Sequence, residues 1–410
     1  MKTLALLVGG GPAPGINGVI GAATIFARRR GARVLGIPNG FAPLVAGDLR
    51  GVRELQIDDV SRIHLLGGSV LQTSRTSPIE PDGSLVSTLA SLTQLGVDHL
   101  LTIGGDGTAY VARRVLEAAG GLFTLVHVPK TIDNDLPLPP GVSTFGYETA
   151  RQEGARVVAR LLEDGRTSSR WYVVVMMGRS AGHLALGAAK AAGATLAILP
   201  EELIGRAPRL ADIARIVEGA MLKRIAMGRS HGVAVIAEGV AELLPEADFP
   251  GGIPLDAHKR PRYAEIPFAD LVAKLAQQGI AELGYDVSVI DKDVGYELRC
   301  AEPNAFDIAY TRDLGAGAAE ALLDGASGVM ITRDDDAIVR VPFADMLDPR
   351  TGQTRVRRVD ITSRTYATAR LLQVRLELAD LMPSALCDAI CAAAKREPAE
   401  LRARYFGAGA

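Results

Sequence analysis

Leu101-Thr-Ile-Gly-Gly-Asp-Gly-Thr108 and, further along, Val128-Pro-Lys-Thr-Ile-Asp-Asn-Asp135 are the two stretches that decide the fold. Each begins as a buried strand. The first strand runs into a glycine-rich turn and a helix, and the second runs into an acidic turn. Glycines let backbone N–H groups approach an anion closely, so the first turn suits phosphate. Side chains alternate along an extended segment, which places Asp133 and Asp135 on one side. A phosphate cradle beside carboxylates indicates phosphoryl transfer.

The composition supports an α/β protein and narrows the function classes. The 410 residues are 48% hydrophobic and rich in glycine, which favours buried parallel strands in two or three lobes. A net charge of −2 gives no electrostatic reason to expect nucleic-acid or membrane binding. Three cysteines argue against a disulfide framework and predict a cytoplasmic protein. Cys387 and Cys391 share a predicted helix but lack partners for a metal site, so they are interpreted as buried small side chains.

Strands alternate with helices along the chain, and several strands end in polar or glycine-rich turns. Strands are predicted at 3–8, 33–36, 170–177, 194–199, 231–237, 287–290 and 328–332, and helices at 18–30, 85–95, 144–163, 268–283 and 307–323. Open α/β sheets bind ligands at the carboxyl ends of their strands, so these turns are the candidate site. The turn after Val8 lacks the G-x-G-x-x-G spacing, and a tight structural turn is the alternative there.

Seven motifs in order make the chain resemble the phosphofructokinase A family over most of its length. They are Gly10–Asn17, Gly67–Arg75, Ile103–Thr108, Pro129–Asp135, Met177–Arg179, Ala237–Gly239 and Tyr296–Arg299. Thr-Ile-Asp-Asn-Asp is highly specific, whereas Gly-Gly-Asp-Gly-Thr also resembles NAD kinases and diacylglycerol kinases. Tyr-x-x-Arg is similar to the long branch of the family, which is ATP-dependent or pyrophosphate-related. A NAD-kinase-like or lipid kinase and a non-catalytic subunit are therefore the weaker alternatives.

The resemblance implies two Rossmann-like α/β lobes with mainly parallel sheets and an active site in the cleft between them. Residues 1–143 would form the donor-binding lobe and residues 144–300 the lobe that binds fructose 6-phosphate. Residues 301–410 would cross between the lobes and complete them. A homodimer or homotetramer is implied, since the family carries an arginine at the position of Arg170 that reaches a neighbouring subunit's site.

The resemblance also implies a role for each site residue. Asp133 would be the general base, and the catalytic set would be Asp133, Thr131 and Arg179. Asp106 and Asp135 would hold Mg²⁺. The donor would be bound by Gly11, Arg75, Thr76, Gly105, Asp106, Gly107, Thr108 and Lys130. The sugar phosphate would be bound by Thr131, Ile132, Asp133, Arg170, Met177, Gly178, Arg179, Glu238, Tyr296 and Arg299.

The choice of phosphoryl donor depends on two residues that point in opposite directions. Pyrophosphate users of the family tend to carry Asp at the position of Gly107, where a carboxylate would repel the α-phosphate of ATP. Lys130 matches pyrophosphate enzymes, which use a lysine there to stabilise the leaving phosphate. The pairing of Gly107 with Lys130 resembles the ATP-dependent enzymes of plants and trypanosomes. The resemblance therefore favours ATP as the donor, with pyrophosphate as the alternative. The helix after Asn17 lacks the effector-binding arginines of short bacterial enzymes, which predicts no regulation by ADP or phosphoenolpyruvate of that type.

Overall fold

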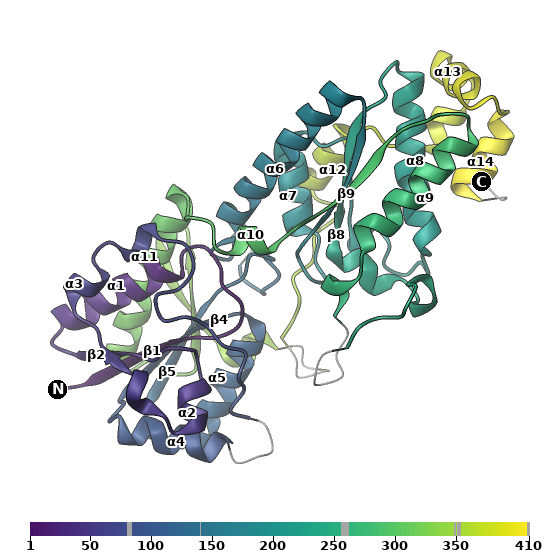
Figure 1. Cartoon of the computed structure of the whole chain (residues 1–410). Helices are drawn as coiled ribbons and strands as arrows, with labels where there is room; N and C mark the ends of the chain where they lie inside the picture. Colours follow the sequence, from purple (N-terminus) through teal and green to yellow (C-terminus); the bar gives the residue numbers. More distant parts are fainter. Residues whose placement is uncertain (80–83, 140, 256–261, 348–349, 351–353, 408–410) are drawn as a thin grey trace. The chain divides into compact units, whose positions relative to one another are not determined.

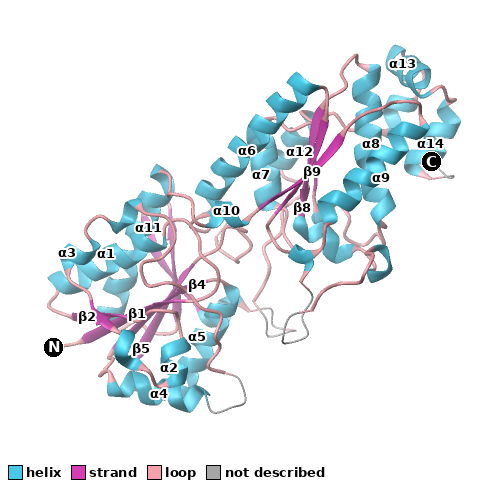
Figure 2. Cartoon of the chain, viewed as in Figure 1, coloured by secondary structure: helices cyan, strands magenta, loops and turns pink. Residues whose placement is uncertain are grey.

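The computed structural model describes residues 1–79, 84–139, 141–255, 262–347, 350 and 354–407. The chain divides into two compact units. Unit 1 comprises Met1–Ala150 and Tyr296–Arg357, and unit 2 comprises Arg151–Gly295 and Arg358–Ala410. Each unit is an α/β structure built on its own mainly parallel sheet (Figure 2), as the sequence predicted. The chain therefore leaves unit 1, builds most of unit 2, returns, and ends in unit 2.

Unit 1 contains a seven-stranded sheet in the order β11-β10-β5-β4-β1-β2-β3. The strands β2, β1, β4, β5 and β10 are parallel, and the outer strands β3 and β11 pair antiparallel. Their bounds are β1 (Thr3–Val8), β2 (Arg33–Gly36), β3 (Arg53–Glu54), β4 (His99–Gly104), β5 (Thr124–Pro129), β10 (Val329–Asp334) and β11 (Ala337–Pro342). The two opening stretches of sequence thus end adjacent strands, which brings their turns to the same edge of the sheet.

Helices cover both faces of this sheet (Figure 1). Alternate residues of β1 show why: Leu4 and Leu6 are buried against one helical layer, whereas Ala5 and Leu7 are buried against the other. One layer holds α1 (Ile16–Arg29), α3 (Ile57–Val60) and α11 (Ala305–Leu323), and the other holds α2 (Ala42–Ala46), α4 (Ser84–Gln94) and α5 (Asp106–Ala119). A strand covered on both faces must be apolar throughout, which is why β1 was recognisable in the sequence.

Unit 2 contains a parallel four-stranded sheet in the order β7-β8-β6-β9. Its strands are β6 (Trp171–Met176), β7 (Leu196–Ile198), β8 (Gly232–Ala237) and β9 (Val289–Val294). Its helices are the long α6 (Tyr147–Ser168), which starts in unit 1, and α7 (His183–Ala192), α8 (Leu210–Ala226), α9 (Phe268–Glu282), α12 (Arg364–Leu371), α13 (Ala385–Ala394) and α14 (Pro398–Phe406). Trp171, fully buried, lies in the largest apolar cluster of this unit.

One predicted strand differs from the sequence-based expectation. The strand expected at 287–290 is β9, which extends to Val294 and includes three exposed charged residues, because it forms an edge of the sheet. The short helix α10 (Tyr296–Arg299) follows it directly. Cys387 and Cys391 do share α13, with their sulfurs 4.0 Å apart.

Candidate active site

Thr108 packs into the glycine turn that follows β1. A Cβ added to Gly9 would lie 2.5 Å from Thr108 Oγ1, and one added to Gly104 would lie 2.4 Å from the same atom. Neither position can therefore carry a larger side chain while Thr108 keeps its place. The backbone of the turn is left bare, with Gly10 at φ 79°. The N–H groups of Gly9 and Gly10 already donate to Ile103 O and Ser74 O, each at 2.8 Å, so an anion at the predicted phosphate cradle would have to be met beyond Gly10.

Lys130 is buried beside that cradle. It follows β5, where its N–H donates to Gly104 O at 2.7 Å, and its side chain is only 5% exposed. Its ammonium Nζ donates to the carbonyl oxygen of Gly11. The structure thus brings Lys130 together with the predicted donor residue Gly11. The buried ammonium group places a positive charge next to the glycine turn, where it would be close to a phosphate bound there.

His127 lies beneath the turn that carries Asp106. It pairs with Thr102 across β4 and β5, its Nδ1 lies 2.9 Å from Thr102 Oγ1, and its Nε2 lies 3.0 Å from Gly104 O. A carbonyl oxygen can only accept, so His127 Nε2 carries the hydrogen and donates to Gly104 O. His127 Nδ1 then accepts from the Thr102 hydroxyl, and the imidazole is neutral. Burial lowers the pKa of His127 to about 4. His127 was not predicted as a site residue from the sequence.

Asp133 lies in the loop that follows Lys130, and its side chain is 8% exposed. Its backbone N–H donates to Thr131 Oγ1 at 3.0 Å. The far end of the loop is tied back, because Thr144 Oγ1 donates to Thr131 O at 2.7 Å. These two hydrogen bonds therefore hold the backbone on either side of Asp133. Arg357 also contacts this loop, and it was not predicted from the sequence.

Arg75 and Thr76 lie next to the glycine turn. Gly10 N–H donates to Ser74 O at 2.8 Å, and Gly9 forms a β-bridge with Ser74. The Thr76 N–H is held by Ser74 Oγ at 3.0 Å. Arg75 is exposed.

Gly107 and Arg299 differ in their surroundings. A Cβ on Gly107 would have no atom within 4 Å, so space is open around it.

Arg299 instead lies over the glycine turn, with its guanidinium carbon 3.3 Å from the Cβ position of Gly11. It also stacks on the exposed Tyr296, 5.2 Å from the ring centre. Within unit 1, Arg299 is thus close to a predicted donor residue, although the resemblance implied that it binds the sugar phosphate.

In unit 2, Glu238 organises the turn that follows β6. Its Oε2 accepts from the N–H groups of Gly178 and Arg179, each at 3.2 Å. Arg179 has a left-handed backbone with φ 48°, which a residue other than glycine adopts only when the surroundings hold it there. Met177 packs against Gly295, at the end of β9, so three strand ends contribute to one cluster. The structure therefore groups Met177, Gly178, Arg179 and Glu238.

Arg170 is not part of that cluster. It precedes Trp171, the first residue of β6, whereas Met177 follows the last. The two ends of a six-residue strand lie about 20 Å apart. Within unit 2, Arg170 is therefore at the opposite edge of the sheet from Arg179.

Asp106 and Asp135, the predicted Mg²⁺ ligands, do not form a complete metal cage on their own. Among the described residues, no group of three or more His, Cys, Asp or Glu side chains is placed to hold a metal ion. Asp106 begins α5 and Asp135 lies in the loop after β5, both in unit 1. Mg²⁺ is commonly bound through one or two carboxylates, with water and substrate phosphates completing the shell. Asp106 and Asp135 match that donor set.

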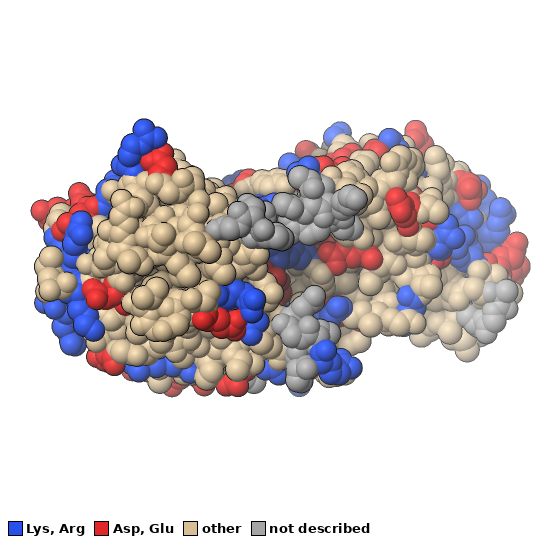
Figure 3. All heavy atoms as spheres, turned by 90° about the horizontal axis from the view of Figure 1, so that it is seen from below, with Lys and Arg blue, Asp and Glu red and all other residues tan. Residues whose placement is uncertain are grey.

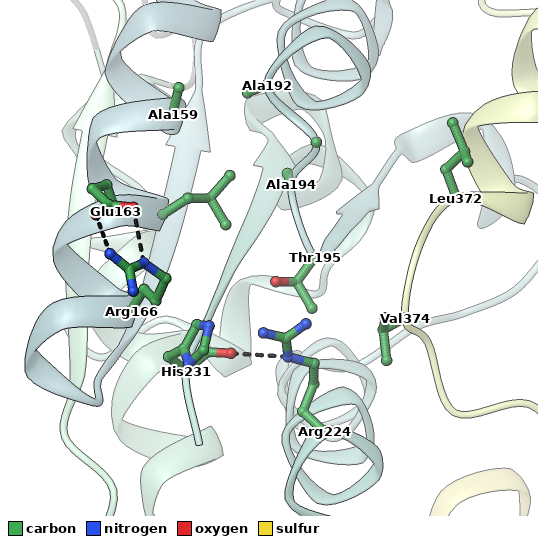
Figure 4. Close-up of a pocket in the computed structure, with 12 residues that line it drawn as sticks. Ala159, Glu163, Arg166, Ala192, Ala194, Thr195, Arg224, His231, Leu372 and Val374 are labelled. Carbon is green, nitrogen blue, oxygen red and sulfur yellow. Dashed lines mark hydrogen bonds and ion pairs between the residues drawn. The ribbon is translucent and has the colours of Figure 1, made fainter. Parts of the chain in front are cut away.

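A pocket of about 310 Å³ in unit 2 lies apart from these residues (Figure 4). It is at the amino ends of β7 and β8, where Thr195, Arg224 and His231 line it. Arg224 Nε donates to His231 O at 3.0 Å. None of the predicted site residues lines this pocket, whereas those of unit 2 other than Arg170 gather at the carboxyl ends of the strands.

Comparison with known proteins identifies the class to which this fold and these turns belong. Residues 3–322 match the family model described as phosphofructokinase. A pyrophosphate–fructose 6-phosphate 1-phosphotransferase of Thermotoga maritima is 48% identical, with 99% of this chain and 98% of the relative covered. A protein of the same name from Naegleria fowleri is 45% identical, with 96% and 93% covered. An ATP-dependent 6-phosphofructokinase of Mycobacterium bovis is 33% identical, with 83% and 93% covered.

The fold agrees with these relatives. A pyrophosphate-dependent phosphofructokinase from Nitrosospira multiformis superposes with a TM-score of 0.70 at 16% identity, covering 96% of this chain and 92% of the other. The chain belongs to the phosphofructokinase family. It is an enzyme that transfers a phosphoryl group to a hydroxyl acceptor.

Two further observations concern the molecule as a whole. No helix in the described part of the chain is long and apolar enough to cross a membrane. On the face drawn in Figure 3, Lys and Arg are interspersed with Asp and Glu, in keeping with the net charge of −2.

Proposed function

We propose that this enzyme transfers a phosphoryl group from pyrophosphate to the 1-hydroxyl of D-fructose 6-phosphate, giving fructose 1,6-bisphosphate and phosphate. The observation that carries the proposal is the buried ammonium of Lys130 beside Gly11 in the glycine cradle. The two relatives at 48% and 45% identity are both named for pyrophosphate. This donor replaces the ATP that the sequence favoured.

The ATP expectation depended on Gly107, and the structure explains why that residue is a weak guide. Space around Gly107 is open, so glycine there does not exclude ATP, but it does not oppose pyrophosphate either. Lys130, in contrast, supplies a positive charge where a leaving phosphate needs one. The ATP-dependent relative is also more distant, at 33% identity. ATP remains the second candidate donor, on the openness at Gly107.

The proposed reaction needs one base and several positive or N–H donors. Asp133 takes the proton from the 1-hydroxyl, whose oxygen then attacks the terminal phosphorus in line while the bond to the leaving phosphate breaks. Thr131 holds the Asp133 backbone, and Lys130 neutralises the leaving phosphate. Mg²⁺, when bound at Asp106 and Asp135, would offset phosphate charge.

The remaining predicted residues divide between the units. Unit 1 supplies the donor site, with Gly11, Arg75, Thr76, Gly105, Gly107 and Thr108. Unit 2 supplies fructose 6-phosphate contacts through Met177, Gly178, Arg179 and Glu238. Arg170 would serve the site of a neighbouring subunit in a homo-oligomer, because it lies at the far end of β6 from Arg179.

The test is a coupled assay for fructose 1,6-bisphosphate with pyrophosphate or ATP as donor, at equal Mg²⁺. We expect turnover with pyrophosphate to exceed turnover with ATP by at least about tenfold. The reason is that a site whose charges match one donor loses at least one electrostatic contact with the other donor, and such a loss typically costs about tenfold or more in rate. Faster turnover with ATP would reject pyrophosphate as the donor, and turnover with neither donor would reject the function.

A further inference from the structure

Arg357 makes a concentrated set of contacts with the loop that carries Asp133. Its Nε donates to Asn134 O at 3.0 Å, one terminal nitrogen donates to Val142 O at 2.6 Å, and the other donates to Asn134 Oδ1. Its backbone N–H donates to Asp135 O at 2.7 Å. One residue thus holds both the outgoing and the returning side of the loop.

Asn134 shows why the loop needs such support. It lies between Asp133 and Asp135 and has a left-handed backbone with φ 57°. This conformation costs free energy in any residue with a side chain, although asparagine tolerates it better than most. Asn134 Oδ1 also accepts from Thr144 N–H at 3.0 Å. The turn at Asn134 and Asp135 is therefore held by hydrogen bonds, and Arg357 supplies three of them.

The chemistry of the contact requires arginine. A guanidinium offers five N–H donors in a fixed plane, so it can reach two carbonyls and an amide oxygen at once. Lysine carries one ammonium group and cannot reproduce that planar fork. Burial lowers the pKa of Arg357, and the charge of Asp135 opposes this shift. The half-buried group stays protonated and remains a donor.

We infer that Arg357 is a positioning residue for phosphoryl transfer, which sets the Asp133–Asp135 turn in its reactive geometry through Asn134. The inference rests on the proposed function, since it assigns Asp133 as the base. Arg357 lies outside residues 3–322, the part of the chain that the family model matches. It acts from a segment more than two hundred residues further along the chain, within the same unit.

Arg357→Lys tests the role, with Arg355→Lys as the matched control. Arg355 is exposed, lies in the same segment, and donates to Asp345 O, outside the loop. A displacement of about 1 Å near the reacting atoms costs roughly 10²-fold in rate. We expect kcat of Arg357→Lys to fall roughly 10- to 100-fold, while KM for fructose 6-phosphate changes less than about threefold. Arg355→Lys should retain the wild-type kcat.

Asn134→Gly is the second variant, because glycine accepts the left-handed backbone but lacks the Oδ1 acceptor. It keeps the test decisive if Arg357→Lys does not fold. We expect the same loss of kcat, and the double variant should lose little more than the more impaired single variant. Additive losses from the two substitutions would show that they act separately and would overturn the inference.

The outcomes separate this inference from the function on which it rests. An active wild type whose kcat survives Arg357→Lys or Asn134→Gly within about twofold would overturn the positioning role alone. A lower melting temperature with an unchanged kcat would also overturn the positioning role, because Arg357 would then have only a structural role. Wild-type protein that uses neither pyrophosphate nor ATP would overturn both.

Discussion

Replacing Lys130 with methionine should separate the two donors. Methionine keeps the length and most of the volume of the lysine stem, so the buried position stays filled. The substitution removes the ammonium that donates to Gly11 O. At about 4 Å from a phosphate charge, and at an effective dielectric constant of about 20, a unit charge contributes about 4 kcal/mol.

Part of that energy already stabilises the bound donor, so only the remainder affects kcat. Removing one group aimed at developing charge typically lowers kcat by roughly 10²–10³, or about 2.7–4 kcal/mol. We therefore expect kcat with pyrophosphate to fall by that factor. Turnover with ATP should fall at least about tenfold less, because the leaving group is then ADP, whose negative charge is spread over two phosphates, so that one ammonium group neutralises a smaller share of it.

The assay measures fructose 1,6-bisphosphate production with each donor, for wild type, Lys130→Met and Lys190→Met. Lys190 is an exposed lysine on α7 that donates to Thr365 O at 3.2 Å, so its variant controls for loss of one positive charge. Equal losses with both donors, or a loss below about fivefold with pyrophosphate, would refute the role given to Lys130.

The other two predictions concern Gly107 and His127. Gly107→Asp should lower turnover with ATP at least about 100-fold, because the carboxylate repels the α-phosphate, and should leave turnover with pyrophosphate within about threefold of the wild-type value. Gly107→Asn is the uncharged control. Equal rates with ATP for the two variants would contradict the role of charge repulsion. Because a Cβ at Gly107 meets no atom within 4 Å, both variants should fold. The pKa of His127 is about 4 in the folded protein, against an ordinary 6.5 when unfolded, so its contribution to stability is full above pH 6.5 and is lost as the pH falls towards 4. Between pH 7 and 5, the unfolding free energy of wild type should fall about 2 kcal/mol more than that of His127→Gln, measured by denaturant titration, and parallel falls would contradict this.

Much of the fold was predictable because parallel strands covered on both faces are apolar along their whole length. Thr3–Val8 and Arg33–Gly36 were placed to the residue for that reason. β11 was missed although it contains Ile338, Val339 and Val341, which favour strands, because it is an outer strand of the sheet and none of its residues is fully buried. The short apolar run that predicted β9 gave no sign of its charged extension for the same reason.

The candidate site was predictable only where chemistry is local in the sequence. Three turns could be recognised from the order and spacing of their residues: the glycine turn, the Asp133–Asp135 turn and the turn after Met177. Arg357 has no such signal, because its segment contains several arginines and only the folded chain shows which one meets Asn134. The identity of the phosphoryl donor was the least secure prediction. It was inferred mainly from Gly107, and the open space around that residue does not distinguish ATP from pyrophosphate.

The packing of Thr108 against two glycines also restricts the order in which this cradle can evolve. A Cβ at Gly9 would lie 3.2 Å from Thr108 Cβ, but one at Gly104 would lie only 2.3 Å from it. A lineage that first replaced Thr108 with alanine could later accept alanine at position 9, with a small local shift. Position 104 would still be closed to alanine. The two glycines look equivalent in the sequence, yet alanine at position 108 would relieve the crowding at position 9, whereas position 104 would stay crowded by the Cβ of residue 108 unless that residue were glycine.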